Sequence, residues 1–445
     1  MPQVWLSLRR IRSTYPRIYQ ELPLDAFQEQ IAWSSFYQTH GWGIYWRPFL
    51  RMAGGERFPA VNRACSLAVV YGHLGHVHRS ERLLQRSQAL YAATLCEVQR
   101  LLGQHSRREL AKLATTSILM GMYNVCPDSL PQVFSCHTNE GNPQFVVEKG
   151  TGRTHNVGTA QILQFCGPEV FQDDLLRDVF RSSRALLTCQ AFSRQQHTFV
   201  QHSLWKSTPW SRSLKTTEDK LMDIVVDLPG LAEIATAPEN RTAAEDQART
   251  LSVRLAQWRW EWDRDNAHTM HEAPVVIATG PVIHHDIERA VAIPYGFNSV
   301  SQALEILTYN SALLYLMQIQ DTLRHSSGSS GDSSGSEHAI SRSTYRRPWR
   351  TLRRHLLRPD EVATMWDVAV EALKTISYIS GQLPVTSQAI TFVPISPFGI
   401  LYWVLRRQSE LSNCFDAVLE HLPVFQNARH IFAGYTVSLP DRQEK

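Results

Sequence analysis

The sequence lacks long apolar runs and is poor in cysteine, and each shortage excludes a class of protein. No apolar run reaches the roughly 18 residues of a membrane-spanning helix, so no such helix is expected. Seven cysteines in 445 residues are an odd number, widely scattered, which argues against a disulfide framework and indicates a reducing compartment. They are Cys65, Cys96, Cys126, Cys136, Cys166, Cys189 and Cys414.

The sequence also lacks an excess of charge of one sign. Lys and Arg number 45 against 41 Asp and Glu, a formal net charge of +4, which predicts no overall attraction to nucleic acid or membranes. At the N-terminus, four arginines and no acid precede Glu21. A transit peptide has this basic, acid-poor composition, but we interpret residues 1–29 as a basic leader before a helical domain. Because no apolar stretch follows, a secretory signal is not expected.

Apolar residues recur every three or four positions through most of the chain, which predicts a mainly α fold with a large multi-helical domain. The strongest helical patterns cover 81–102, 110–123, 175–192, 243–266 and 299–323.

Composition divides the rest of the chain. After the leader, we expect one helical domain over 30–324. Residues 325–358 form a Ser/Gly-rich and then Arg-rich loop, because such a composition cannot bury enough apolar surface to become ordered. The C-terminal residues 359–445 return to helical patterns and are expected to pack on the same domain.

Catalytic signatures are scarce. The sequence has no Gly-x-Ser-x-Gly, no phosphate-cradling glycine loop and no dinucleotide-binding glycine pattern, so we predict no catalytic residues and no cofactor. A thiol at Cys166 precedes a turn, where a structural role is commoner than a reactive one. The cluster His73, His76 and His78 could share a metal at helical spacing, but we favour a polar helix end or loop and predict no metal site.

Two further polar clusters leave alternatives open. The adjacent His284 and His285 could belong to an acid–base group or a ligand pocket, although neighbouring side chains point apart on a helix or strand. Six arginines between 346 and 358 suit phosphate contacts or nuclear import, and equally a solvated basic loop. The candidate residues of that segment are Arg346, Arg347, Arg350, Arg353 and Arg354.

The stretch "HSLWKSTPW", residues 202–210, is too apolar for a solvated loop. Taken alone, Trp205 and Trp210 around Lys206 form an aromatic binding patch. The surrounding sequence favours a structural corner, in which both tryptophans fill a groove between the helix at "GPE" and the helix at "LPGL".

That surrounding sequence carries a family resemblance. "THNVGTAQILQFCGPEVFQDD", "HTFVQHSLWKSTPW" and "TTEDKLMDIVVDLPGLAE" occur in this order and resemble the large helical domain of fungal-specific transcription factors. The resemblance covers roughly residues 30 to 435. His155, Gly158, Gly167, Pro168 and Glu169 match the start of the motif, whereas Cys166 stands where the family has arginine.

A second departure concerns DNA recognition. Members of the family usually begin with six closely spaced cysteines that hold two zinc ions and place a helix in the DNA groove. The first hundred residues here contain only Cys65 and Cys96. The resemblance therefore implies a regulator that does not read DNA sequence itself. Such a protein is expected in the nucleus, or otherwise in the cytoplasm. Its partners would be other regulatory proteins, a second copy of the chain or a small-molecule effector, in a setting such as a fungal secondary-metabolite gene cluster.

Two alternatives remain. The helical domain could have become an enzyme or small-molecule binder of natural-product biosynthesis, with a pocket formed by aromatic and imidazole side chains. Alternatively, the gene could start further upstream and encode a zinc cluster there. The pocket candidates are His155, His202, Trp205, Trp210, His284 and His285.

Overall fold

The structure is a computed structural model that describes residues 27–39, 49–103, 106–125, 151–266, 270–272, 295–325 and 355–382, with Pro397, Leu401 and Val404. The described chain is mainly helical, as the sequence predicts. One short antiparallel pair, β1 (Met270–Glu272) and β2 (Tyr295–Phe297), accompanies the helices. None of the described helices combines the length and apolar character needed to cross a membrane.

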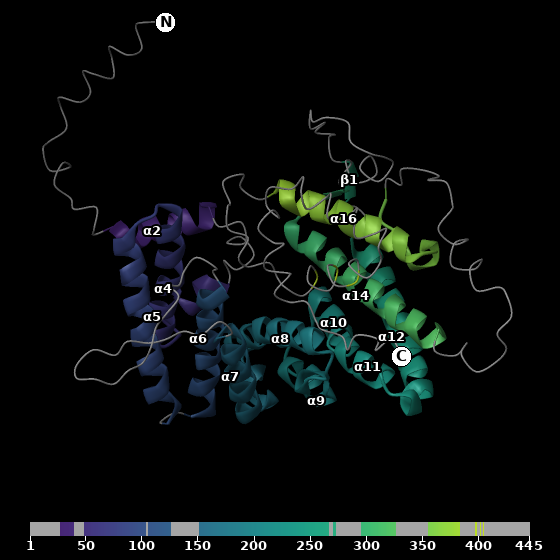
Figure 1. Ribbon diagram of the computed structural model, residues 1–445, viewed down its shortest axis with the longest axis horizontal. Helices are drawn as coiled ribbons and strands as arrows, with labels where there is room; N and C mark the ends of the chain where they lie inside the picture. The colour runs from purple at the N-terminus through teal and green to yellow at the C-terminus, as the bar shows by residue number, and fades with distance from the viewer. Residues whose placement is uncertain are drawn as a thin grey trace, which may run out of the picture.

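The N-terminal helices stand side by side at one end of the molecule (Figure 1). Helix α4 packs along α5 and also contacts α2 and α6, while α6 packs closely along α7. Their bounds are α2 (Gln28–Thr39), α4 (Ala60–Val77), α5 (Glu81–Leu102), α6 (Arg107–Val125) and α7 (Thr151–Cys166).

Helix α8 (Asp174–Arg194) runs from these helices towards the opposite end of the molecule (Figure 1). It contacts α6 and α7 on one side, and α10 and α11 on the other. Its first turn is capped by Asp173, whose side chain accepts from the backbone N–H groups of Leu175 and Leu176. Short elements surround it, namely the 3-10 helix η3 (Pro168–Gln172), η4 (Phe199–Gln201), α9 (Ser203–Ser207), η5 (Thr208–Trp210), α10 (Thr217–Val225) and α11 (Leu228–Ala235).

The C-terminal part of the described chain is built on three long helices. Helix α14 lies between α12 and α16 and contacts both of them, and β2 contacts α14 and α16. The elements are η6 (Pro238–Asn240), α12 (Arg241–Asp265), α14 (Val300–His325), η8 (Pro359–Glu361) and α16 (Met365–Gly381).

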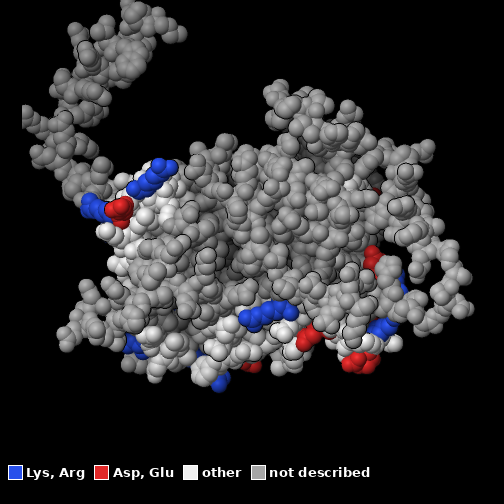
Figure 2. Space-filling model, viewed as in Figure 1, with Lys and Arg blue, Asp and Glu red and all other residues white. Residues whose placement is uncertain are grey.

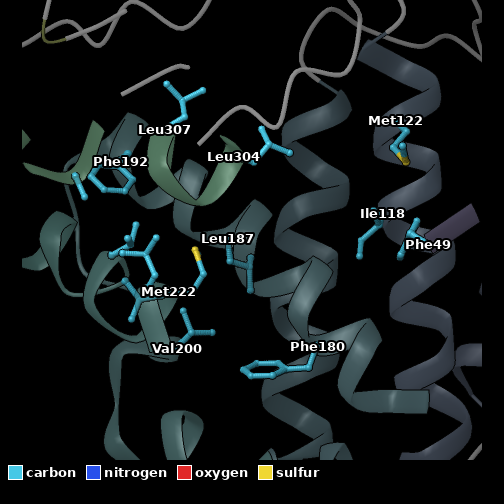
Figure 3. Close-up of a cluster of buried hydrophobic side chains, with 14 of the residues drawn as sticks. Phe49, Ile118, Met122, Phe180, Leu187, Phe192, Val200, Met222, Leu304 and Leu307 are labelled. Carbon is cyan, nitrogen blue, oxygen red and sulfur yellow. The ribbon is translucent and has the colours of Figure 1, made fainter. Parts of the chain in front are cut away.

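The buried apolar side chains of both ends join in one continuous core. In Figure 3, Leu187 and Phe192 of α8, Met222 of α10 and Leu304 of α14 lie among the side chains that fill the interior on one side of α8. On the other side, Ile118 and Met122 of α6 lie in the N-terminal part of the same core. Helix α8 therefore buries apolar residues along its length between the two ends of the molecule, and the "HSLWKSTPW" stretch lies beside it.

Two segments that the sequence analysis names are helical in the structure. The "LPGL" sequence begins α11, and Pro229 lies in its first turn, where its missing N–H has no helical partner to lose. The "GHLGHVH" segment forms the C-terminal end of α4, which continues through Gly72 and Gly75 to Val77 and is capped by His78. Both glycines face α5, where a side chain would leave too little room.

The closeness of α4 and α5 at Gly75 gives a stability prediction. A Cβ atom at Gly75 would lie 2.8 Å from Cδ2 of Leu84 and 3.1 Å from the backbone nitrogen of Leu84. Gly75→Ala should therefore lower the free energy of unfolding by about 1–3 kcal/mol, as overpacking does. Gly103→Ala is the matched control, because nothing lies within 4 Å of a Cβ atom there. Equal thermal stability of the two variants would contradict this packing.

Candidate functional site

The two tryptophans of "HSLWKSTPW" are buried in an aromatic cluster. Trp205 and Trp210 are 8% and 5% exposed. The Trp205 ring centroid lies 4.9 Å from that of Phe199, 5.5 Å from that of Phe180 and 6.0 Å from that of Phe171. The interpretation as a structural corner agrees with this geometry. The walls are η3, η4 and α8, so Trp205 fills the groove beside the "GPE" turn.

Trp210 connects the corner to a buried group of charges, which we name the Asp219 network: Arg181, Arg184, Trp210, Lys215, Thr216, Asp219 and Asp223. The indole Nε1–H donates to Asp219 Oδ2 over 3.0 Å. The guanidinium carbon of Arg184 lies 4.6 Å from the Trp210 ring centroid, and Lys215 Nζ lies 5.1 Å from it. The tryptophan therefore carries both an apolar and a polar contact, as buried tryptophans usually do.

Asp219 is the acceptor on which this network converges. Arg181 donates from Nε to Oδ1 at 3.0 Å and from Nη2 to Oδ2 at 2.7 Å, a two-bond pairing along one edge of the guanidinium. Arg184 donates to Asp219 Oδ1 at 3.1 Å and to Asp223 Oδ1 at 2.9 Å. Thr216 forms a capping box with Asp219 at the start of α10. Helices α8 and α10 are thus joined by charged hydrogen bonds.

The charges determine how Asp219 titrates. Burial alone would raise the pKa of its carboxyl, but the hydrogen bond from Arg181 and the charges of Arg184 and Arg181 outweigh burial and lower the pKa below its ordinary value. Burial lowers the pKa of Arg184, against the raising effect of Asp223 and Asp219. Because every charged group is paired, the network is suited to holding helices together rather than to exchanging protons with a substrate.

The central Lys206 of the stretch is also paired. Its Nζ forms an ion pair with Asp227 Oδ1, and Asp227 Oδ2 accepts from Arg254 Nη1 of α12 at 2.8 Å. Arg254 Nη2 also donates to the backbone carbonyl of Asp223 at 3.1 Å. Lys206 is therefore not the free cation that a binding patch would need, since it pairs with Asp227 at the start of α11, which Arg254 of α12 also binds.

The contacts of His202 and His155 differ from those of the two tryptophans. His202 is exposed, and its Nδ1 accepts from the Leu204 backbone N–H at 3.3 Å, which caps α9. His155 lies on α7, where its Nε2 is 3.1 Å from the hydroxyl of Tyr91 of α5. The Tyr91 ring in turn stacks on Tyr123 of α6 at 4.3 Å. The described pocket candidates therefore occupy three different places. Trp205 and Trp210 lie in the buried corner, His202 caps α9 at the surface, and His155 lies where α5, α6 and α7 meet.

Burial lowers the pKa of His155 to about 4 from the ordinary 6.5. The folded protein therefore keeps this imidazole neutral, while the unfolded chain takes up a proton as the pH falls below about 6.5. Stability should fall between pH 6.5 and pH 4. His155→Gln should remove part of this pH dependence, measured as the melting temperature across that range. His202→Gln is the exposed control, and an identical pH dependence in wild type and His155→Gln would contradict the assignment.

The remaining described candidates offer little chemistry. His73 is buried in α4 against Phe36, and burial, with smaller effects from His76 and His78, lowers its pKa to about 4. Burial raises the pKa of Cys166 to about 11, against the charge of Arg107, which makes a thiolate there unfavourable. Across the described residues, no three side chains from His, Cys, Asp and Glu gather closely enough to hold a metal ion.

A second buried polar group escaped sequence reasoning. It lies where α12, α14 and α16 meet, and we name it the Arg259 group: Arg259, Asp263, Asn310, Glu371 and Lys374. Arg259 is fully buried and pairs with Asp263. Glu371 Oε1 accepts from Asn310 Nδ2 at 3.1 Å, and its Oε2 accepts from the Leu357 backbone N–H. The available signal was a charge inside an apolar stripe, because Arg259 stands between Leu255 and Trp262 on the buried face of α12.

The other sequence candidates lie outside the described residues. These are His284 and His285, and the arginines Arg346, Arg347, Arg350, Arg353 and Arg354. Comparison of the chain with protein-family models, with curated proteins and with solved structures found no match.

Proposed function

We propose that this chain is a regulatory protein that controls gene expression by binding an effector or another regulator. In this proposal it resembles the helical domain of fungal-specific transcription factors, and these 445 residues do not read DNA sequence themselves. It would act in the nucleus, in a setting such as a secondary-metabolite gene cluster. Other regulators or a second copy of the chain would be its partners.

One observation carries the proposal. The segment with the family resemblance, from His155 to Leu231, folds as a run of short and long helices that pack on α8. Its distinctive residues hold that run together: His155 meets Tyr91, Trp210 meets Asp219, and Gly167 adopts a φ of +79° that favours glycine. These contacts hold the segment together as one packed body, which supports its proposed role as a domain that presents a surface to an effector or a partner.

The surface charges support the part of the proposal that concerns DNA. Binding to a DNA backbone needs a concentration of Lys and Arg on one surface. On the face shown in Figure 2, the described basic and acidic side chains are interspersed along the edge of the molecule rather than gathered by sign. Many of the exposed arginines on the described helices also pair with a carboxylate, such as Arg249 with Asp246 and Arg324 with Asp321.

A titration of the purified protein on promoter DNA tests this. Fluorescently labelled promoter fragments from the genes it controls are compared with scrambled fragments of equal length, at two salt concentrations. We expect equal, weak and salt-sensitive binding to both. Tight binding that prefers the promoter sequence would reject the proposal that these residues do not read DNA.

The alternative, a small-molecule binder in natural-product biosynthesis, is favoured by a different observation. Two donors of the buried Arg259 have no hydrogen-bond partner in the described part of the chain. Incubation with polyketide or terpenoid intermediates, followed by product analysis and thermal melting, separates the two functions. Turnover would favour the enzyme, and stabilisation without turnover would agree with an effector.

A further inference from the structure

Arg259 occupies an unusual position for a charged side chain. It projects from α12 into the interior and is fully buried. Its guanidinium carbon lies 5.1 Å from the ring centroid of Trp262 and 5.9 Å from that of Tyr309. Nη1 forms an ion pair with Asp263, but neither Nε nor Nη2 has a hydrogen-bond partner among the described residues.

Two buried donors without partners are unfavourable. Each unsatisfied buried N–H costs about 1–3 kcal/mol, and a guanidinium cannot escape by losing its proton. Nε and Nη2 also form one edge of the guanidinium, on which two parallel N–H groups can bond both oxygens of a carboxylate. Arg181 of the same molecule shows this pairing, with Nε and Nη2 on the two oxygens of Asp219 at 3.0 and 2.7 Å.

The described carboxylates near Arg259 are engaged elsewhere. Both oxygens of Glu371 accept hydrogen bonds, from Asn310 and from the backbone N–H of Leu357. Glu305 Oε2 accepts from Trp262 Nε1 at 2.8 Å. Asp263 already pairs with Nη1. The Nε/Nη2 edge therefore has no carboxylate partner among the described residues.

The surrounding charges also suit an anion. Burial raises the pKa of Glu371, against Arg259 and its two hydrogen bonds, which favours the neutral acid. Lys374, one turn further along α16, is a second buried basic side chain, and its Nζ lies 4.9 Å from the ring centroid of Tyr295. Burial lowers the pKa of Lys374, against the charge of Glu371, so Arg259 is the cation of this group that keeps its charge.

We propose that the Nε/Nη2 edge of Arg259 binds the carboxylate of a small organic acid at the junction of α12, α14 and α16. The rings of Trp262 and Tyr309 flank the guanidinium and suit an acid with a flat apolar body. This inference deepens the effector part of the proposed function and rests on it for its biological meaning. The binding chemistry itself does not depend on gene control.

Thermal melting of the full chain tests the site. Sodium acetate and sodium benzoate are titrated against sodium chloride at equal ionic strength, with sodium phosphate as a further anion. We expect both carboxylates to raise the melting temperature above the chloride value, benzoate more than acetate, because a ligand that binds only the folded state stabilises it. No carboxylate-specific rise, or a rise with phosphate alone, would overturn the proposal.

Variants then locate the effect. Arg259→Gln should abolish the carboxylate-specific rise, whereas Arg254→Gln, on the same helix but paired with Asp227, should keep it. Arg259→Lys is the second variant, because it keeps the charge and loses the paired edge. We expect it to weaken benzoate binding at least about tenfold in calorimetric titration, a loss of about 1.4 kcal/mol. Unchanged benzoate affinity in Arg259→Lys would reject the site.

The outcome is distinguishable from a failure of the proposed function. Carboxylate binding at Arg259 without any effect of the protein on transcripts would keep the site and reject the regulatory role. Altered transcripts without carboxylate binding would reject the site and keep that role.

Discussion

Asp219→Ala is expected to lower the free energy of unfolding by about 3–5 kcal/mol, the usual cost of breaking a buried ion pair. The side chains of Asp219 and Arg184 are each only 2% exposed, so the substitution leaves a buried guanidinium without one of its two carboxylates. It also removes an acceptor from Trp210 and the reciprocal cap of α10. Chemical denaturation followed by tryptophan fluorescence measures the loss.

Asp246→Ala is the matched control for this experiment. Asp246 also pairs with an arginine, but its side chain is 64% exposed, and exposed pairs contribute about 0–1 kcal/mol. If the two alanine variants lost the same stability, the Asp219 network would not hold α8 and α10 together.

The pH dependence of the same variant follows from the lowered pKa of Asp219. A carboxyl whose folded-state pKa is depressed contributes stability above its unfolded pKa of about 3.9, and that contribution is lost as the pH falls through the folded value. The stability difference between wild type and Asp219→Ala should therefore be full at neutral pH. It should shrink as the pH falls below about 3.9.

Trp210→Ala is expected to cost a similar amount, about 3–5 kcal/mol, because it empties a large buried site. Trp210→Phe keeps an aromatic ring against Phe180 but loses the hydrogen bond to Asp219 and part of the buried ring, so a smaller loss of about 1–3 kcal/mol is expected. Because Trp210 and Asp219 are in contact, the double alanine variant should lose less than the sum of the two single losses. Thermal melting of wild type, Trp210→Ala, Asp219→Ala and the double alanine variant measures this coupling.

The competing interpretation of Trp210 makes a different prediction. If the tryptophan lined a ligand pocket, Trp210→Ala would melt like wild type and lose a ligand or a partner. That result would return "HSLWKSTPW" to the role of a binding patch.

The helices could be predicted from sequence because their signal is local. The pattern over 81–102 coincides with α5, and the patterns over 243–266 and 299–323 fall within one or two residues of α12 and α14. A helix buries whichever face carries the apolar stripe, so the spacing within one segment is sufficient. The packing role of the glycines of α4 could not be predicted in the same way, because it depends on α5, whose approach no local pattern encodes.

The Asp219 network could not be predicted because its contacts are long-range. Arg181 and Arg184 stand 38 and 35 positions from Asp219, and in sequence they look like an ordinary solvated face. One signal was available. Arg184 lies in the apolar stripe of α8 between Phe180 and Leu187, where a charge must find a partner. Arg259 gives the same signal in α12; its partner Asp263 stands four positions further on, but Asn310 and Glu371 of its group come from α14 and α16.

The transcripts of a strain that lacks this gene test the central proposal most directly. RNA is compared between wild type, the deletion strain and the deletion strain complemented with these 445 residues. If the chain regulates genes through an effector or a partner, a coordinated set of transcripts changes in the deletion strain and returns with the complementing chain. Identical transcript profiles in all three strains would contradict the proposal.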